Sequence, residues 1–444
     1  MTLEELLTKT SDGQVLWVSP KNQMTAGALR QDIAVCKGLL LGKDTSRVAL
    51  EPSDSVRALT WMMALDGMAR SVFLVPDSLR RSDNYNSLKT RFQPTLTVDD
   101  VFTEKVFEEI SDLSGGCREV AVATTHWVLA TSGTTGIPKL IEHSTASLTK
   151  TCKLDTGRGR EFTWGLVYDP FRFAGLQVVL QALASGSKLV LCNHIGNVKD
   201  QAAFLRENNV NALSATPTYW RKLLMSGVLG NHRFRQITLG GEPADQSILN
   251  ALKAAFPEAR IAHIYASTEA GVGFSVTDGL MGFPKRYLER GVAGNQLRIG
   301  ESGTLLIKPE KHVATESGAS LAKSDGFIDS GDLVVLRDER VLFLGRDSGA
   351  INVGGNKVIP EEVEAVIREV EGVAEVLVKP KGSGVMGQLV TADIQPMKVD
   401  AGTASLKKQI LAHCRARLEN YKVPALIRFV PEIEHNPTGK ISRK

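Results

Sequence analysis

Cysteines, aromatic residues and long hydrophobic runs are all scarce in this sequence of 444 residues. The five cysteines are widely spaced and include no CxxC pair, which argues against a disulfide framework and a structural zinc site. No stretch approaches the roughly 18 uninterrupted apolar residues of a membrane span, and the N-terminus lacks the apolar core of a secretory signal. We therefore expect a cytoplasmic protein with reduced thiols and no membrane span.

A large excess of charge of one sign is absent as well. Lysine and arginine number 53 against 49 aspartates and glutamates, so the net charge is only +4 and we expect no nucleic-acid partner. The apolar fraction of 43% is that of an ordinary globular protein with a sizeable core. At this length we expect more than one domain.

Short apolar runs alternate with helical patterns through the first part of the chain. Residues 47–50, 55–69 and 71–76 have the patterns of a strand, a helix and a strand, and the alternation recurs over residues 175–191 and 219–239. This repeated βαβ pattern predicts parallel sheets covered by helices, with ligands bound in loops at the carboxyl ends of the strands.

The pattern changes toward the C-terminus. Short β-rich runs between residues 291 and 345 predict a small antiparallel subdomain, in which residues 309–325 form a polar loop. After residue 346, helices at 360–370 and 404–420 and strands at 374–378, 389–394 and 425–430 predict a separate α+β unit. We therefore expect an α/β protein with an N-terminal domain over residues 1–346 and a C-terminal domain over residues 347–444.

A glycine- and hydroxyl-rich stretch follows a strand-like segment at residues 126–130. Its two glycines, three positions apart, allow backbone N–H groups to turn toward an anion, while hydroxyls and a lysine add donors and positive charge. The residues concerned are Thr131, Ser132, Gly133, Thr134, Thr135, Gly136 and Lys139. A Walker A loop is excluded because a proline precedes the lysine and no hydroxyl follows it. The stretch therefore predicts a polyphosphate loop, and the alternative is a hydroxyl-rich surface turn.

This loop resembles the phosphate loop of the acyl-adenylate-forming (AMP-binding) superfamily, which comprises acyl- and aryl-CoA ligases, nonribosomal adenylation domains and luciferases. Further segments resemble the later motifs of that family in the same order. They are Gly-Gly-Glu-Pro at 240–243, Tyr-Ala-Ser-Thr-Glu-Ala-Gly at 265–271, Asp-Gly-Phe-Ile-Asp-Ser-Gly-Asp at 325–332, Gly-Arg at 345–346 and Asn-Pro-Thr-Gly-Lys at 436–440.

The resemblance implies a nucleotide site. Tyr265 would stack on adenine, Asp332 would accept both ribose hydroxyls, and Arg346 would reach the nucleotide. Thr268 would contact the α-phosphate and Glu269 would hold Mg²⁺, which prefers hard oxygen ligands. The remaining residues of the implied adenine pocket are Gly241, Glu242, Pro243, Ala266 and Ser267, with Ala266 replacing the usual glycine.

The resemblance also implies a mobile C-terminal domain. In the first half-reaction Lys440 would enter the site as a catalytic residue, beside Thr268 and Lys139. In the second, the domain would rotate and Gly354 and Gly355 would line a pantetheine tunnel, although this pair fits a type I′ hairpin turn equally well. The hinge position holds Ser348, where the family commonly has aspartate or lysine.

On the acyl side, Arg172 stands where the family commonly has histidine. An arginine there could recognise a second carboxylate or a phenolate, or it could be a structural partner of Asp169. Asp169 also suggests the amine-binding aspartate of the nonribosomal code, but its spacing to Gly175 and Gly186 favours a non-amino acid substrate. The expected substrate-binding residues are Arg172, Gly241, Ala266 and Gly271.

The implied activity is ATP-dependent conversion of a carboxylic acid to an acyl-adenylate with release of pyrophosphate, followed by thioester formation on CoA. The alternative is an enzyme that loads the phosphopantetheine of an acyl carrier protein. Six basic residues could serve either acceptor or simply face solvent: Lys379, Lys381, Lys407, Lys408, Arg415 and Arg417. A P-loop NTPase lacks its motif here, a regulatory nucleotide binder needs neither Lys440 nor Glu269, and nothing favours an oxygenase.

Overall fold

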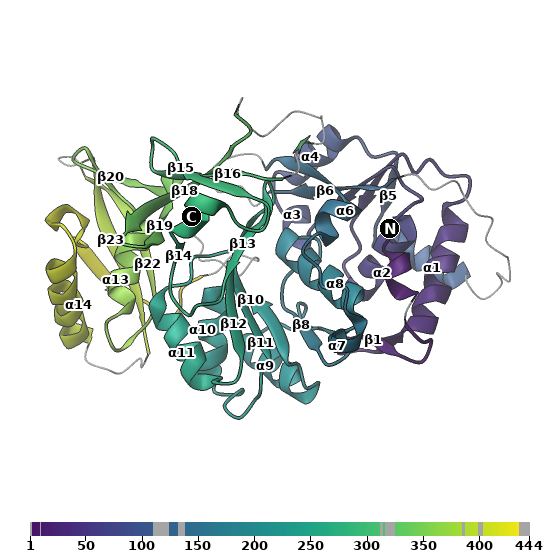
Figure 1. Ribbon diagram of the computed structural model, residues 1–444, viewed down its shortest axis with the longest axis horizontal. Helices are drawn as coiled ribbons and strands as arrows, with labels where there is room; N and C mark the ends of the chain where they lie inside the picture. The colour runs from purple at the N-terminus through teal and green to yellow at the C-terminus, as the bar shows by residue number, and fades with distance from the viewer. Residues whose placement is uncertain are drawn as a thin grey trace.

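The computed structural model describes residues 2–8, 10–109, 124–131, 138–310, 314–315, 325–383, 387–397 and 403–434. Within these ranges the strands form one sheet of eight strands, one of six and two of five (Figure 1). The chain runs from the two larger sheets, through the first five-stranded sheet, to the second, which lies with α13 and α14 at the opposite end of the molecule from the N-terminus.

The eight-stranded sheet has the order β13-β12-β11-β10-β8-β9-β1-β2. Its central strands are parallel because each is followed by a helix that returns the chain to the same edge. The strands are β1 (Val15–Val18), β2 (Gln23–Thr25), β8 (Thr163–Leu166), β9 (Lys188–Leu191), β10 (Ala212–Ala215), β11 (Gln236–Gly240), β12 (Arg260–Ser267) and β13 (Gly271–Val276). The helices are α8 (Phe173–Ser185), α9 (Val198–Glu207), α10 (Pro217–Ser226) and α11 (Gln246–Ala255).

The six-stranded sheet has the order β17-β7-β6-β4-β3-β5 and is parallel from β6 to β5. Its strands are β3 (Arg47–Leu50), β4 (Ser71–Leu74), β5 (Leu96–Val98), β6 (His126–Ala130), β7 (Leu140–Ser144) and β17 (Ala314–Thr315). Its helices include α1 (Ala26–Leu40), α2 (Ser55–Leu65), α3 (Asp77–Arg80), α4 (Tyr85–Phe92), α5 (Asp100–Glu109) and α6 (Thr145–Thr149).

The largest apolar core joins these two sheets. Trp17 and Leu191 of the eight-stranded sheet belong to the same buried cluster as Val48 and Trp127 of the six-stranded sheet, together with residues of α1, α2 and α8. Each sheet buries one face here, and burial of side chains this large contributes about 2 kcal/mol apiece. The packing therefore fixes the carboxyl ends of both sets of parallel strands relative to each other.

The first five-stranded sheet is antiparallel throughout and has the order β14-β19-β18-β16-β15. Its strands are β14 (Phe283–Pro284), β15 (Gln296–Ile299), β16 (Thr304–Lys308), β18 (Ile328–Arg337) and β19 (Arg340–Arg346). In the β18–β19 hairpin, Asp332 pairs with Arg346 across the strands.

The last sheet contains only strands that follow residue 350 and has its own buried core. Its strands are β20 (Ile351–Val353), β21 (Asn356–Val358), β22 (Val373–Ser383), β23 (Gly387–Pro396) and β24 (Leu426–Phe429), with helices α13 (Pro360–Arg368) and α14 (Thr403–Arg417). The junction with β19 is tight: a Cβ on Gly345 would lie 2.3 Å from Glu361 Oε2 and 2.5 Å from Ile359 Cγ2.

The expected α/β architecture with a β-rich subdomain is confirmed, while the boundary after residue 346 and the mobility of the C-terminal unit stay predictions. Within the region expected to be a polar loop, Ala314–Thr315 pairs with β7 instead, which is a correction. Cys36, Cys152, Cys192 and Cys414 are free thiols among the described residues. In the same part of the chain, no helix is long and apolar enough to cross a membrane.

Candidate active site

Two hydrogen bonds between Thr131 and Lys139 close the base of the expected phosphate loop. Thr131 and Lys139 leave the antiparallel strands β6 and β7, and the Thr131 N–H donates to the Lys139 carbonyl at 2.8 Å. The Lys139 N–H returns a bond to Thr131 Oγ1 at 2.9 Å, and the Lys139 side chain is exposed. Ser132, Gly133, Thr134, Thr135 and Gly136 lie outside the described residues. The structure therefore describes where the loop begins and ends.

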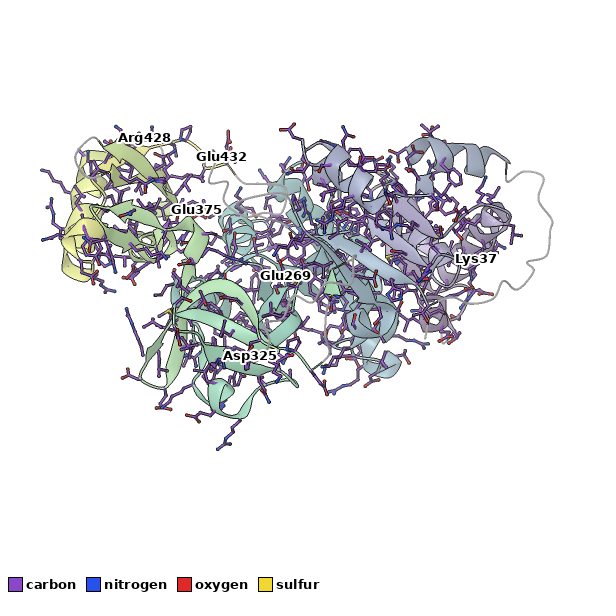
Figure 2. All side chains as sticks on the ribbon, turned by 90° about the horizontal axis from the view of Figure 1, so that it is seen from above. Lys37, Glu269, Asp325, Glu375, Arg428 and Glu432 are labelled. Atoms are coloured by element: carbon purple, nitrogen blue, oxygen red, sulfur yellow. The ribbon has the colours of Figure 1, made fainter. Side chains whose placement is uncertain are left out.

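Thr268 and Glu269 occupy the turn between β12 and β13. A hydrogen bond within the turn stabilises it: the Ala270 N–H donates to Ser267 Oγ at 3.0 Å. Figure 2 shows Glu269 in the middle of the molecule, between Glu375 of the C-terminal sheet and Lys37 of α1. No cluster of three metal-ligating side chains occurs in the described part of the chain. A single carboxylate nevertheless suits Mg²⁺, which is commonly held by one or two carboxylates together with substrate phosphates, and the metal-binding role of Glu269 stays a prediction.

His143 links this turn to the phosphate loop, and sequence reasoning missed it. It lies on β7, is only 4% exposed, and its Nε2 lies 3.0 Å from the carbonyl oxygen of Thr268. Burial lowers the pKa of His143 to about 4, so the ring is neutral and donates through Nε2–H. No motif flags this histidine, because its role depends on a contact across 125 positions of sequence.

Tyr265, Asp332 and Arg346 meet in one cluster, as their implied common role requires. The Tyr265 hydroxyl donates to Asp332 Oδ2 at 2.6 Å, and Arg346 Nε lies 2.7 Å from Asp332 Oδ1. Arg346 Nη1 also donates to the Ser330 carbonyl at 3.2 Å. Burial, followed by the charge of Asp332, raises the pKa of Tyr265, which keeps its hydroxyl protonated. A carboxylate can accept several hydrogen bonds, and acceptance of the ribose hydroxyls by Asp332 stays a prediction.

The ring of Tyr265 already has aromatic neighbours. Phe274 lies nearly parallel to it at a centroid distance of 5.3 Å and an angle of 14°, and Phe343 does so at 5.2 Å and 7°. These are offset stacks, in which each ring covers part of the next. An adenine can therefore stack only on the part of Tyr265 that the phenylalanines leave open, and its position there stays a prediction.

The 240–243 turn follows β11 directly. Gly241 has a φ of +81°, which glycine adopts without strain. The Glu242 carboxylate also binds the start of α10, because its Oε2 accepts the Thr218 N–H at 3.1 Å. Ala266 and Ser267 end β12 opposite Val272 and Gly271 of β13. The contacts of Gly241, Glu242, Pro243, Ala266, Ser267 and Gly271 with ligands stay predictions.

Arg172 sits immediately before α8 at the carboxyl end of β8. Its Nη2 donates to Ser78 Oγ at 2.9 Å, but among the described residues its buried Nε has no hydrogen-bond partner. Burial lowers the pKa of Arg172, and the nearby charge of Asp169 partly offsets this shift. The guanidinium therefore has a free donor that an anionic group could satisfy.

Both carboxylate oxygens of Asp169 accept hydrogen bonds from backbone N–H groups. Its Oδ1 accepts the Phe171 N–H at 2.9 Å and its Oδ2 accepts the Asp77 N–H at 3.0 Å, so it joins the ends of β8 and β4. Burial raises its pKa, and these bonds counteract the rise. This arrangement argues for a structural carboxylate and against an amine-binding one.

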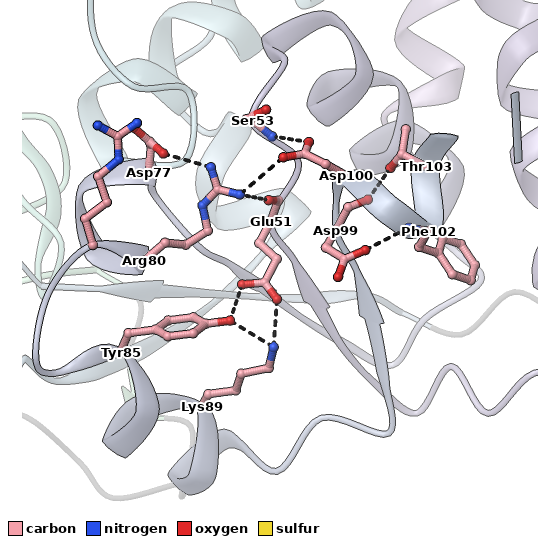
Figure 3. Close-up of polar contacts among 11 residues, drawn as sticks. Glu51, Ser53, Asp77, Arg80, Tyr85, Lys89, Asp99, Asp100, Phe102 and Thr103 are labelled. Carbon is pink, nitrogen blue, oxygen red and sulfur yellow. Dashed lines mark hydrogen bonds and ion pairs between the residues drawn. The ribbon is translucent and has the colours of Figure 1, made fainter. Parts of the chain in front are cut away.

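A cavity of about 580 Å³ opens beside this junction. Its lining includes Asp77, Ser78, Arg81, Ser82, Asp83, Asn84, Val167, Asp169, Asn193 and His194. Figure 3 shows how the first part of this wall is held: Arg80 Nη2 donates to Asp77 Oδ1 at 2.7 Å and Arg80 Nη1 donates to the Glu51 carbonyl at 2.6 Å. The buried Glu51 carboxylate in turn accepts from Tyr85 and Lys89 at 2.6 and 2.7 Å. The Ser78 side of the cavity is therefore built on a fixed ionic frame.

Gly354 and Gly355 form the two-residue turn between β20 and β21. Both have positive φ, +56° and +86°, as a type I′ turn requires, so the hairpin interpretation is confirmed and tunnel lining stays a prediction. Ser348 lies in a short 3-10 helix directly after Arg346. Lys440 lies outside the described residues.

Comparisons with known proteins agree with this geometry. The sequence model of the AMP-binding enzymes matches residues 69–314, and that of the AMP-binding enzyme C-terminal domain matches residues 362–440. A 2-succinylbenzoate–CoA ligase from Listeria innocua serovar 6a is 24% identical over 465 residues, covering 98% of this chain and 96% of that protein.

Two solved structures are similar in fold. An anthranilate CoA ligase in complex with anthranoyl-AMP superposes with a TM-score of 0.78 at 18% identity, covering 99% of this chain and 95% of the other. The o-succinylbenzoate CoA synthetase of Bacillus subtilis, in complex with its acyl-adenylate intermediate, gives a TM-score of 0.74 at 17% identity, with coverages of 99% and 96%.

Proposed function

Because this chain belongs to the AMP-binding enzyme family, we propose that it is an AMP-forming acid–CoA ligase. The enzyme uses ATP to convert a carboxylic acid into an acyl-adenylate, releases pyrophosphate, and passes the acyl group to the thiol of CoA. The observation that carries this proposal is the cluster of Tyr265, Asp332 and Arg346, three residues distant in sequence whose polar groups converge. We place the enzyme in the cytoplasm, where ATP and CoA are both available.

In the first half-reaction, a carboxylate oxygen attacks the α-phosphorus of ATP in line, and the bond to the β-phosphate oxygen breaks. Asp332 and Arg346 hold the ribose, Thr268 donates to the α-phosphate, and the loop between Thr131 and Lys139 holds the leaving phosphates. Two anions meet in this step, so preorganised positive charge dominates catalysis. Glu269 would hold Mg²⁺, which when bound neutralises phosphate charge.

Lys440 supplies the remaining cation. We expect Lys440→Ala to abolish acid-dependent exchange of pyrophosphate into ATP while leaving the thermal unfolding midpoint unchanged. The measurement is isotope exchange with the full-length chain, and Lys444→Ala, a lysine substitution four positions further along the sequence, serves as control. Exchange at a near-normal rate in Lys440→Ala would contradict the assignment, and formation of ADP and phosphate would contradict the reaction type.

In the second half-reaction, the thiol sulfur attacks the acyl carbonyl carbon and AMP leaves. The C-terminal unit rotates about the Ser348 region, and the turn at Gly354 and Gly355 borders the path of the thiol. CoA is the favoured acceptor because the Listeria innocua relative and the anthranilate enzyme described above are both named as CoA ligases. Incubation of acid, ATP and enzyme with either CoA or a panel of carrier proteins tests this choice, and acylation of a carrier alone would overturn it.

The substrate carries a second anionic group. Arg172 has a buried, unsatisfied Nε and donates through Nη2 to Ser78, a residue of the cavity wall, and the Listeria innocua relative is named for a succinylbenzoate, an acid with two carboxyl groups. One carboxylate is activated while the other pairs with Arg172. A pyrophosphate-release screen of 2-succinylbenzoate, anthranilate and benzoate tests this, and equal kcat/KM values for the three acids would contradict it.

A further inference from the structure

One buried side chain touches both halves of the active site described above. His143 lies on β7, four residues after Lys139, at the strand that ends the phosphate loop. Its Nε2 faces the Thr268 carbonyl at 3.0 Å, and its ring lies against Phe173 at a centroid distance of 5.7 Å. Phe173 is the first residue of α8 and directly follows Arg172.

These contacts join three separate elements. The β6–β7 hairpin carries the phosphate loop, the β12–β13 turn carries Thr268 and Glu269, and the start of α8 carries Arg172. Neither the turn nor the start of α8 pairs with β7 through the backbone, because β7 is bonded to β6 and β17. The side chain of His143 therefore supplies a direct polar contact where the sheets themselves supply none.

The hydrogen bond has only one direction. The carbonyl of Thr268 can only accept, so His143 must present Nε2–H toward it. A backbone carbonyl held by a buried donor fixes the orientation of its own peptide unit, and the Thr268 side chain leaves the chain at that unit. Small displacements of groups that contact the reacting phosphate cost rate much more than they cost ground-state binding.

We propose that His143 is a positioning residue for the first half-reaction. Its hydrogen bond to the Thr268 carbonyl fixes the position of the Thr268–Glu269 turn relative to the phosphate loop, and its ring contact with Phe173 fixes the position of that turn relative to Arg172. It touches no reacting atom. The proposal rests on the proposed function, because Thr268 is assigned there to the α-phosphate.

Three substitutions separate the donor from the bulk of the ring. His143→Gln places an amide N–H near the position of Nε2, whereas His143→Asn ends near Nδ1 and falls short of the carbonyl. His143→Leu keeps apolar volume against Phe173 and removes every donor. We expect His143→Asn and His143→Leu to lower kcat for pyrophosphate exchange about tenfold per active site, with KM for ATP within about twofold, and His143→Gln to restore most of the rate.

Active-site titration corrects for misfolded protein in each variant. A residue that only stabilises the fold would lower the unfolding midpoint and leave kcat per titrated site unchanged, and this outcome overturns the proposal. Equal rates in His143→Gln and His143→Asn overturn it as well.

Amide hydrogen exchange separates failure of this proposal from failure of the proposed function, because it needs no turnover. We expect the amides of residues 268–270 to exchange about tenfold faster in His143→Asn and His143→Leu than in the wild type and His143→Gln. If no acid supports pyrophosphate exchange in the wild type, the ligase assignment fails, while this exchange pattern still tests the contact. Unchanged exchange in all variants overturns the role of His143.

Discussion

The nucleotide side and the acyl side of this site satisfy their charged groups in opposite ways. Around Asp332 the polar groups bind one another: Tyr265 and Arg346 both contact its carboxylate in the ligand-free structure. Around Arg172 the pairing is incomplete, because its Nη2 donates to Ser78 while its buried Nε makes no hydrogen bond to the described residues. Among the described residues, the first cluster is paired within itself, whereas the second leaves one buried donor without a hydrogen bond.

The difference indicates two modes of recognition, one with preorganised polar groups and one with a buried donor left for the substrate. Every substrate pair includes the same nucleotide, so a self-paired cluster keeps the ribose site rigid between turnovers at little cost in stability. On the proposed acyl side the acid is the variable partner, and an unsatisfied buried donor at Arg172 would reject acids that cannot pair with it. The contrast predicts that nucleotide-side substitutions affect all acids equally and that acyl-side substitutions affect only some.

The largest effect is expected from Asp332→Ala, which removes the common partner of Tyr265 and Arg346 and the proposed acceptor for the ribose hydroxyls. The loss of two charge-assisted hydrogen bonds lowers kcat/KM for ATP about 1,000-fold, or about 4 kcal/mol. Steady-state kinetics with several acids measures this, and Glu339→Ala, at the tip of the same hairpin, is the control. A loss that differs among acids would contradict the division between the two sides.

His143 contacts elements of both sides, and we expect its contribution to folding stability to depend on pH. Its pKa is lowered from 6.5 to about 4 in the folded state, so at pH values between these the unfolded chain binds a proton that the folded chain does not. Its contribution to stability is therefore fully present above pH 6.5 and is lost as the pH falls toward 4, by about 3 kcal/mol. Urea unfolding at several pH values, compared between the wild type and His143→Gln, measures this. Parallel pH curves would show that the ring is not held neutral.

Arg172→Met tests the acyl side directly. Removal of the guanidinium lowers kcat/KM about 30-fold for an acid with a second carboxylate, or about 2 kcal/mol, and changes it little for benzoate. Arg172→Lys is the matched control, because it keeps the charge but loses the planar array of donors. Equal losses with both classes of acid would assign Arg172 a structural role.

The smallest effect is expected from Tyr265→Phe. The ring stacks with Phe274 and Phe343 remain, and only the hydroxyl donor to Asp332 is lost. We expect KM for ATP to rise about fivefold, or about 1 kcal/mol, with no change in preference among acids. An unchanged KM would show that the Arg346 contact alone orients the carboxylate.

Much of the fold could be predicted because hydrophobic periodicity reports local structure. The strand expected at residues 47–50 matches β3, and the helix expected at 360–370 matches α13 closely. Other strands are less easily predicted from hydropathy. β18 spans Ile328–Arg337, so polar residues of the 325–332 motif lie on the strand itself. β22 extends through Pro380 and Lys381 because pairing with β23, not hydropathy, determines its length.

In the site, too, features that depend on local sequence could be predicted and features that depend on distant contacts could not. The order of the motifs predicted the nucleotide residues, whose roles stay a proposal, and the twin glycines at 354 and 355 predicted their turn, because both predictions depend on residue types at fixed local spacing. The roles of Asp169, Glu242 and His143 could not be read in this way. Each depends on a hydrogen bond to the backbone of a distant segment, and a backbone group has no signature in the sequence.

By itself, therefore, the sequence determined the family resemblance, the alternation of strands and helices, and the chemical types available for phosphate, ribose and acid. Only the tertiary structure decided that Asp332 is already paired, that Asp169 joins the ends of β8 and β4, that Arg172 Nε has no hydrogen bond among the described residues, and that His143 contacts the Thr268 carbonyl. The physical reason is that motif chemistry is local, whereas the state of a buried polar group depends on which distant atoms the packed sheets bring within hydrogen-bond distance.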